Sequence, residues 1–434
     1  MTRYQRIILH AGLHKTGTTS VQENCFRHRD LLLQHGVEYP VFSFRERQII
    51  NHSDPLAGVF SSRPRAYGMA RRQGVEDDPA EASTAFTGQL NKILAEPRGT
   101  TLLLSAEMVS DFNANDMQAL RRRLQDATDD FRVIAYVRSP QSSLASILQQ
   151  RALAGSAVDP HKLVNLVGQR FKRLRQGFGD ILQLYNFHEA AVEDGGLVGH
   201  FFRALGLPQA TVDGLEFSRA NPKMPMEAYR LMQAINRAYP VDGVASHGVK
   251  RHYHDLRPLY ALPGQPFRIE CLQDQALSEA LASQSQWLAT ELGWEFPEVS
   301  HHTPEPLWQT PTLLELETAI STLGNSELRN AAARALEQEA RDIEETDAAT
   351  AAVLRFIATS IARQGDCPPQ FALDRLGADY FKFAALQFEQ ASPQTALYLM
   401  SLASQLRPDA AFIAERIQHY RSKLDGSRDQ GIDY

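Results

Sequence analysis

The sequence contains few cysteines and lacks long apolar runs. Its three cysteines are widely spaced, which excludes a disulfide framework and the paired spacing of a zinc site. No apolar stretch reaches the length of about 18 residues that a membrane-spanning helix needs. The first residues, MTRYQR, lead straight into a short apolar run without the cleavage site of a secretory signal. We therefore expect a cytoplasmic protein without a transmembrane segment.

The sequence also lacks an excess of positive charge. It has 45 Lys and Arg against 51 Asp and Glu, a net charge of −6. Residues 301–434 hold 12 of these basic and 19 of the acidic residues, which leaves 33 against 32 for residues 1–300. Nucleic-acid-binding domains usually carry a basic excess, so we expect no nucleic-acid partner. The nearly neutral first part is compatible with a small anionic ligand.

The length and patterning predict two structural regions. A chain of 434 residues exceeds one typical domain. Short β-branched runs at 6–12, 100–107, 131–137 and 180–187 read as buried strands, and helical patterns lie between them. This alternation predicts an α/β domain over 1–300, with a parallel sheet flanked by helices. An all-α region is expected over 301–434. The segment 45–98, rich in Arg, Gly, Pro and Asp, is expected to be irregular and to line an acceptor site.

One stretch of the helical region, 377–410, resembles a tetratricopeptide repeat. With Pro408 at position 32 of the repeat, aromatic, apolar and small residues occupy the matching positions Tyr380, Phe383, Ala384, Ala396, Met400 and Ala403. A single repeat cannot bury its own face, so we expect it to pack on the helices of 311–365. The region could serve a protein partner or a homodimer, and an ordinary helical hairpin is the alternative.

The stretch LHAGLHKTGTTSVQ, residues 9–22, joins the first predicted strand to a helix. Backbone N–H groups and the helix dipole make such a junction an anion site. Gly17 allows close approach of a ligand, Thr18 and Thr19 add hydroxyl groups, and Lys15 adds a mobile positive charge. In the Walker loop the lysine follows the last glycine, whereas Lys15 precedes Gly17. The order of residues therefore does not favour a metal-bound triphosphate.

A second motif, YVRSPQSSLAS, follows the third predicted strand. Arg138 ends the strand, where ligands of open α/β sheets bind, and arginine can hold a phosphate through two hydrogen bonds. Ser139 and Pro140 suit the start of a helix, and Ser146 lies two turns further along.

Both motifs resemble those of sulfotransferases that use 3′-phosphoadenosine 5′-phosphosulfate (PAPS). HKTGTT resembles their 5′-phosphosulfate loop, P-K-[ST]-G-T-T, and residues 9–22 are particularly similar to a bacterial branch. Arg138 with Ser146 resembles their 3′-phosphate motif. The resemblance covers roughly residues 1–300. It implies a P-loop NTPase-like sulfotransferase fold, PAPS as the donor, 3′-phosphoadenosine 5′-phosphate (PAP) as the product, and no metal.

The resemblance also implies roles for individual residues. Sulfuryl transfer would be an in-line displacement onto an acceptor hydroxyl, in which Lys15 stabilises charge on the leaving phosphate. Arg138 and Ser146 would hold the 3′-phosphate. The residues expected around the 5′-phosphosulfate are His14, Thr16, Gly17, Thr18, Thr19 and Ser20.

The general base has two candidates. Many carbohydrate sulfotransferases use a glutamate, and Glu107 follows the second predicted strand in LLLSAEMVSD. His52, in INHSDP, is the alternative, because a neutral histidine titrates in the useful range. A glutamate base suggests a carbohydrate or glycolipid acceptor.

Two positions depart from the family pattern. Ser20 stands where many members have a tryptophan that stacks on adenine, and the glycine-rich basic motif near the end of the domain is missing. Lys250 and Arg251, in HGVKRHYHDLRP, are candidate contacts to the donor or the acceptor in that region. A non-catalytic PAPS-binding scaffold and a P-loop kinase-like phosphotransferase are the alternative functions.

Overall fold

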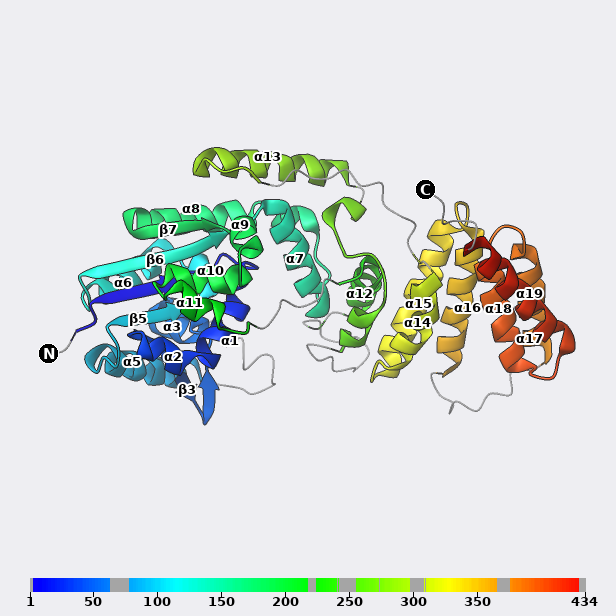
Figure 1. The fold of residues 1–434 in the computed structure, drawn as a ribbon, viewed down its shortest axis with the longest axis horizontal. Helices are drawn as coiled ribbons and strands as arrows, with labels where there is room; N and C mark the ends of the chain where they lie inside the picture. The colour runs from blue at the N-terminus through cyan, green and yellow to red at the C-terminus, as the bar shows by residue number, and fades with distance from the viewer. Residues whose placement is uncertain are drawn as a thin grey trace. The chain divides into compact units, whose positions relative to one another are not determined.

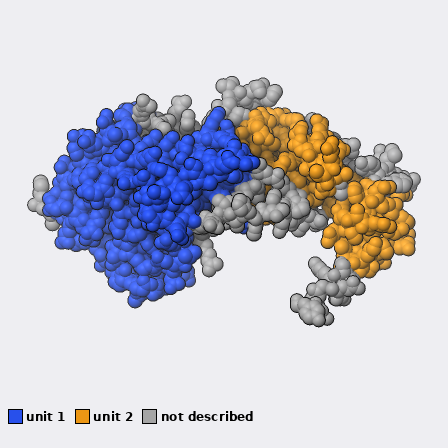
Figure 2. All heavy atoms as spheres, turned by 90° about the horizontal axis from the view of Figure 1, so that it is seen from above, with its two compact units in different colours: residues 1–151, 158–223, 267–304 blue, residues 152–157, 224–266, 305–434 orange. Residues whose placement is uncertain are grey.

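The computed structural model describes residues 3–62, 78–217, 224–239, 241, 255–272, 274–296, 308, 310–364 and 375–428. The chain forms two compact units, coloured separately in Figure 2. The first comprises residues 1–151, 158–223 and 267–304, and the second comprises 152–157, 224–266 and 305–434.

The first unit is built on a five-stranded sheet (Figure 1). Its strands are β1 (Arg6–His10), β2 (Val37–Glu38), β5 (Thr101–Ser105), β6 (Asp130–Val137) and β7 (Leu182–Asn186), in the order β2-β5-β1-β6-β7. All neighbours are parallel, with His10 opposite Ser105 and Val137 opposite Asn186. The carboxyl ends of the strands therefore meet at one edge of the sheet. β1 is the central strand, between β5 and β6. The predicted parallel α/β fold is confirmed, and so are its four predicted strands.

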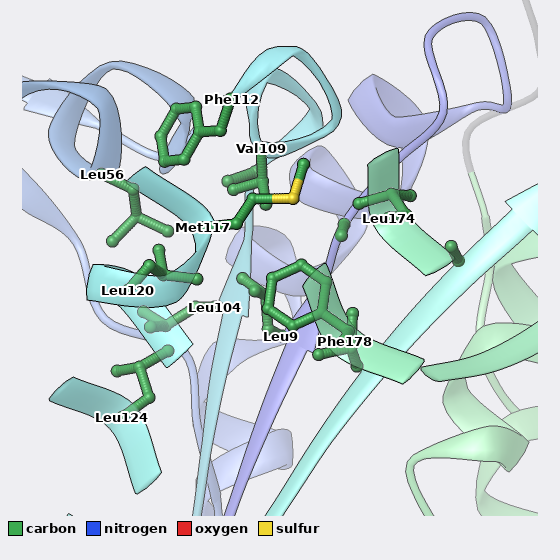
Figure 3. Packing of buried hydrophobic residues seen from close by; sticks show 14 of the residues in the cluster. Leu9, Leu56, Leu104, Val109, Phe112, Met117, Leu120, Leu124, Leu174 and Phe178 are labelled. Carbon is green, nitrogen blue, oxygen red and sulfur yellow. The ribbon is translucent and has the colours of Figure 1, made fainter. Parts of the chain in front are cut away.

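Helices cover both faces of this sheet, because side chains alternate between the faces along each strand. Leu9 joins a core with Phe86 of α5 (Pro79–Ala95), Leu120 of α6 (Ala114–Gln125) and Phe178 of α8 (Leu166–Phe178), part of which Figure 3 shows. On the opposite face Ile8 joins a core formed with α1 (Thr18–Arg27) and α10 (Gly196–Ala204). Full burial of such side chains contributes roughly 1.5–3 kcal/mol each. The other elements of this unit are α2 (Arg29–Gln34), β3 (Phe42–Phe44), β4 (Arg47–Ile49), α3 (Ser53–Phe60), η1 (Glu107–Asp111), η2 (Pro160–Leu163), η3 (Gly179–Ile181), α9 (Phe187–Val192), α11 (Gln209–Asp213), η5 (Ile269–Leu272) and α13 (Gln275–Leu292).

Two local expectations are corrected. The segment 45–98 is not irregular where it is described, since it contains α3 and the long helix α5. The Asp78 side chain accepts a hydrogen bond from the N–H of Ala80, and Pro79 occupies the first turn of α5. Asp and Pro thus begin a helix here and do not mark a loop. The helix predicted after the first strand is divided at His28 into α1 and α2.

The second unit is helical, as expected for residues 301–434. Its helices are α12 (Met226–Ala238), α14 (Thr310–Ser321), α15 (Ser326–Ile343), α16 (Ala348–Gln364), α17 (Arg375–Phe388), α18 (Pro393–Leu406) and α19 (Ala411–Arg428), with the short turn η4 (Arg257–Ala261); α7 (Pro140–Leu153) begins in the first unit. α12 lies against α15, where Arg230 Nε donates to Glu339 Oε1 (3.0 Å). Residues 224–266 thus belong to the second unit, whereas the sequence suggested one boundary near residue 301.

The segment that resembles a tetratricopeptide repeat forms a helical hairpin. α17 and α18 pack together, and Ala396, Met400 and Ala403 of α18 are fully buried. The side chains of Tyr380 and Phe383 lie outside the described residues. A plain hairpin has the same features, so the repeat assignment stays a prediction. Among the described residues, no helix is both long and apolar enough to cross a membrane.

Candidate active site

The loop between β1 and α1 has an unusual backbone. Lys15 (φ 70°) and Gly17 (φ 76°) both adopt the left-handed conformation, which is costly for a residue with a Cβ atom. Thr16 Oγ1 donates to the carbonyl of Leu13 (2.6 Å) and closes the turn. Gly17 caps the N-terminus of α1, and a Cβ atom there would lie 2.2 Å from Leu197 Cδ2. Strained backbone of this kind occurs most often at functional sites.

Thr18 carries an unpartnered hydroxyl group at the base of this loop. Its Oγ1 is buried and has no hydrogen-bond partner among the described residues. It lies directly over Gly12, where a Cβ atom would come within 2.3 Å of it. Buried polar atoms are nearly always paired, so an unpaired one beside this loop points to a ligand or a water molecule. Thr19 is exposed and Ser20 is half-buried on the first turn of α1.

A chain of four ionisable side chains lies beside the loop; we call this group the clamp (Arg170, Asp111, His14 and Glu107). His14 Nδ1 lies 3.0 Å from Glu107 Oε1, and its Nε2 lies 2.9 Å from Asp111 Oδ2. Arg170 of α8 donates to both oxygens of Asp111, from Nε (2.8 Å) and from Nη2 (3.3 Å). The four side chains are between 11% and 24% exposed. The clamp joins the β1 loop to η1, which follows β5.

The clamp shifts the pKa values of its members. Burial raises the pKa of Glu107, but the hydrogen bond from His14 and the charges of His14, Lys15 and Arg170 lower it by more, so the net pKa lies below its ordinary value. Asp111 is shifted downward for the same reasons, with Arg170 as its second partner. Burial lowers the pKa of His14, whereas its two carboxylate partners raise it above the ordinary value. Glu107 is therefore an anion at neutral pH.

Arg138 meets the loop from the other side of β1. Its Nη1 donates to the carbonyl oxygen of Lys15 (2.9 Å), and its Nε donates to Ser142 Oγ (2.7 Å). The guanidinium also lies over the ring of Phe187, 4.8 Å from its centre, which is a cation–π contact. Burial lowers its pKa to about 10, so it stays a cation at neutral pH. These contacts use two of the five N–H groups of the guanidinium.

His188 completes this side of the site, which we call the arginine corner (Arg138, Ser142, Phe187 and His188). His188 Nε2 accepts a hydrogen bond from the N–H of Ser139 (3.2 Å). Burial and the charge of Arg138 both lower the pKa of His188. The pKa of His188 is therefore shifted in the opposite direction to that of His14.

The remaining predicted residues have different surroundings. His52 is fully buried; its Nδ1 accepts from the N–H of Ser105 (2.9 Å) and its Nε2 lies 2.8 Å from the carbonyl of Pro40. Both ring nitrogens are thus engaged in the protein interior. Ser146 is half-buried on α7. Lys250 and Arg251 lie outside the described residues.

Sequence reasoning did not single out Asp111, Arg170, Ser142 or Phe187. Asp111 lies four residues beyond Glu107 in the same motif, and Ser142 lies four beyond Arg138, so local spacing could have indicated both. No local pattern points to Arg170, which is 59 residues from Asp111. Among the described residues, no group of three or more His, Cys, Asp or Glu side chains is arranged to hold a metal ion.

The sequence matches no family model and no curated protein sequence. Two solved structures are similar to it. A sulfotransferase from Alicyclobacillus acidocaldarius is 16% identical, with a TM-score of 0.30, over 54% of this chain and 93% of that one. The sulfotransferase domain from the curacin biosynthetic pathway is 12% identical, with a TM-score of 0.32, over 68% and 99%.

Proposed function

We propose that the protein is a sulfotransferase that moves the sulfuryl group of PAPS to an acceptor hydroxyl. The observation that carries the proposal is the hydrogen bond from Arg138 to the carbonyl of Lys15. These residues come from two motifs that are 123 positions apart, one suited to a phosphosulfate and one to a second phosphate. A ligand with two separate anionic groups would use both.

The residues of the loop fit a phosphosulfate group. Thr18 offers a buried hydroxyl that lacks a partner among the described residues, and Gly12 leaves the space that this hydroxyl occupies. Lys15 lies near Glu107 and Arg138, and burial lowers its pKa while the charge of Glu107 opposes that shift. Together the loop cation, the clamp and Arg138 leave an excess of positive charge for an anion.

In the proposed step the acceptor oxygen attacks sulfur, and the bond from sulfur to the 5′-phosphate oxygen breaks. Glu107 takes the hydroxyl proton, and Lys15 stabilises the negative charge on the departing phosphate. We assign the base to Glu107 and not to His52, because both nitrogens of the buried His52 ring are already engaged. A carbohydrate or glycolipid acceptor, a cytoplasmic location and a partner for the helical unit stay predictions.

The two alternative functions fit the site less well. A kinase-like enzyme needs carboxylates to hold Mg²⁺, but Asp111 already receives Arg170 and His14, and Glu107 receives His14. A non-catalytic scaffold would have no use for an ionised carboxylate beside the transfer loop.

Calorimetric binding of PAP to the full chain tests the proposal. We expect the wild type to bind PAP in preference to ATP–Mg²⁺, and Lys15→Ala to weaken PAP binding about tenfold or more, which is about 1.4 kcal/mol. Lys172→Ala is the matched control, because Lys172 is exposed and lies over Trp287 of α13. A preference for ATP–Mg²⁺, or equal affinities for both variants, would overturn the assignment of the donor.

A further inference from the structure

The position of His14 between two carboxylates determines its protonation state. Each ring nitrogen lies about 3 Å from a carboxylate oxygen, Glu107 Oε1 on one side and Asp111 Oδ2 on the other. A neutral imidazole has one donor and one acceptor nitrogen, whereas an ionised carboxylate only accepts. Both contacts are hydrogen bonds only if His14 carries two protons or one of the acids is protonated.

The neighbouring charges decide between these possibilities. Arg170 of α8 donates to both oxygens of Asp111, which favours the carboxylate form. The charge of Lys15 favours the ionised form of Glu107 as well. The charged groups around His14 are thus two anions from η1, Glu107 and Asp111, and two cations, Arg170 and Lys15. These charges favour placing the second proton on the imidazole.

We propose that His14 is a positioning residue: as an imidazolium anchored by Asp111 and Arg170, it orients the Glu107 carboxylate and keeps it ionised. This inference rests on the proposed role of Glu107 as the base. In the resembled loop, P-K-[ST]-G-T-T, a proline stands at the position of His14, and proline has no side-chain N–H to donate. The clamp is thus a feature of this chain that its motif alone does not supply.

The clamp leaves one oxygen of Glu107 for chemistry. Oε1 accepts from His14, and among the described residues Oε2 has no hydrogen-bond partner. An oxygen held in this way presents a fixed lone pair to an acceptor hydroxyl, as proton transfer in a positioned complex requires. The cost is a weaker base, because the imidazolium lowers the pKa of Glu107.

NMR titration of the ligand-free protein tests the clamp directly. With ¹⁵N-labelled histidine, assigned by loss of a signal in His14→Gln, we expect His14 to titrate above the ordinary value of about 6.5. Asp111→Asn keeps the shape of the partner but removes its charge, so it should lower the pKa of His14 by about one unit or more. His161, which has a single carboxylate partner in Asp274, is the internal control and should not move.

A second titration follows the side-chain carboxyl carbon of Glu107. We expect His14→Gln to raise the pKa of Glu107 by about one unit, an effect that a merely structural role of His14 would not produce. The proposal is overturned if His14 is a neutral single tautomer at pH 6, or if the pKa of Glu107 is the same in both proteins. Because neither titration uses a donor, a protein with the expected shifts that fails to bind PAP would disprove only the proposed function.

Discussion

The clamp and the arginine corner hold their positive charge in opposite ways. In the clamp both cations face carboxylates, and the flanking acids raise the pKa of His14. In the arginine corner the partners of Arg138 are a hydroxyl, a carbonyl and an aromatic ring, all uncharged. The cation of Arg138 also lowers the pKa of the nearby His188. The proposed base thus lies among paired charges, whereas the charge of Arg138 has only uncharged partners in the arginine corner.

The largest expected effect comes from replacing Glu107, a member of the clamp. Glu107→Gln keeps an oxygen that can accept from His14 but removes the base, so kcat should fall about 10²–10⁴-fold. PAP affinity should stay within a few-fold of the wild type. The assay is transfer of labelled sulfate from PAPS to a mixture of oligosaccharides. Glu81→Gln, at an exposed pair with Arg45, is the control, and full activity in Glu107→Gln would reject this base.

A smaller effect, on PAP binding, is expected from replacing Arg138 in the arginine corner. Arg138→Gln should weaken PAP binding by about tenfold or more, since a charged partner of the 3′-phosphate is lost. Adenosine 5′-phosphate, which lacks that group, should bind both proteins equally. Arg132→Gln, on the strand β6 that precedes Arg138, should change neither affinity, because Arg132 is paired with Asp130. Equal losses for the two ligands would mean that Arg138 supports the loop through Lys15 and does not bind the phosphate.

The smallest expected effect concerns the backbone at Lys15, in the loop beside the clamp and the arginine corner. Lys15 has a positive φ, so Lys15→Gly should be more stable than Lys15→Ala by about 1 kcal/mol, even though glycine is the more flexible residue. Urea unfolding of both variants measures this difference. If the alanine variant were as stable as the glycine variant, the left-handed conformation would carry no strain, and the loop would need no support from Arg138.

The sequence predicted the parts of the site that depend on local patterns. The strand, loop and helix around Lys15 follow from spacing alone, and parallel strands bring Arg138 and Glu107 to the same edge. His52 could not be judged in this way, because its burial depends on the rings of Tyr39 and Phe42 that pack around it. Arg170 could not be predicted from the sequence for a similar reason, because only the packing of α8 beside η1 brings it to Asp111. The prediction of irregular structure over 45–98 was wrong, because Asp78 and Pro79 fit the start of a helix as well as a turn.

The path of the chain restricts how the protein can be shortened. Residues 224–266 lie in the helical unit, and the chain then returns to the first unit for 267–304. A cut near residue 300 would remove α15, against which α12 packs, and would leave Arg230 without Glu339. The helical unit is therefore not a detachable tail. Grafting or deleting it would involve three separate stretches of the gene, which encode residues 152–157, 224–266 and 305–434.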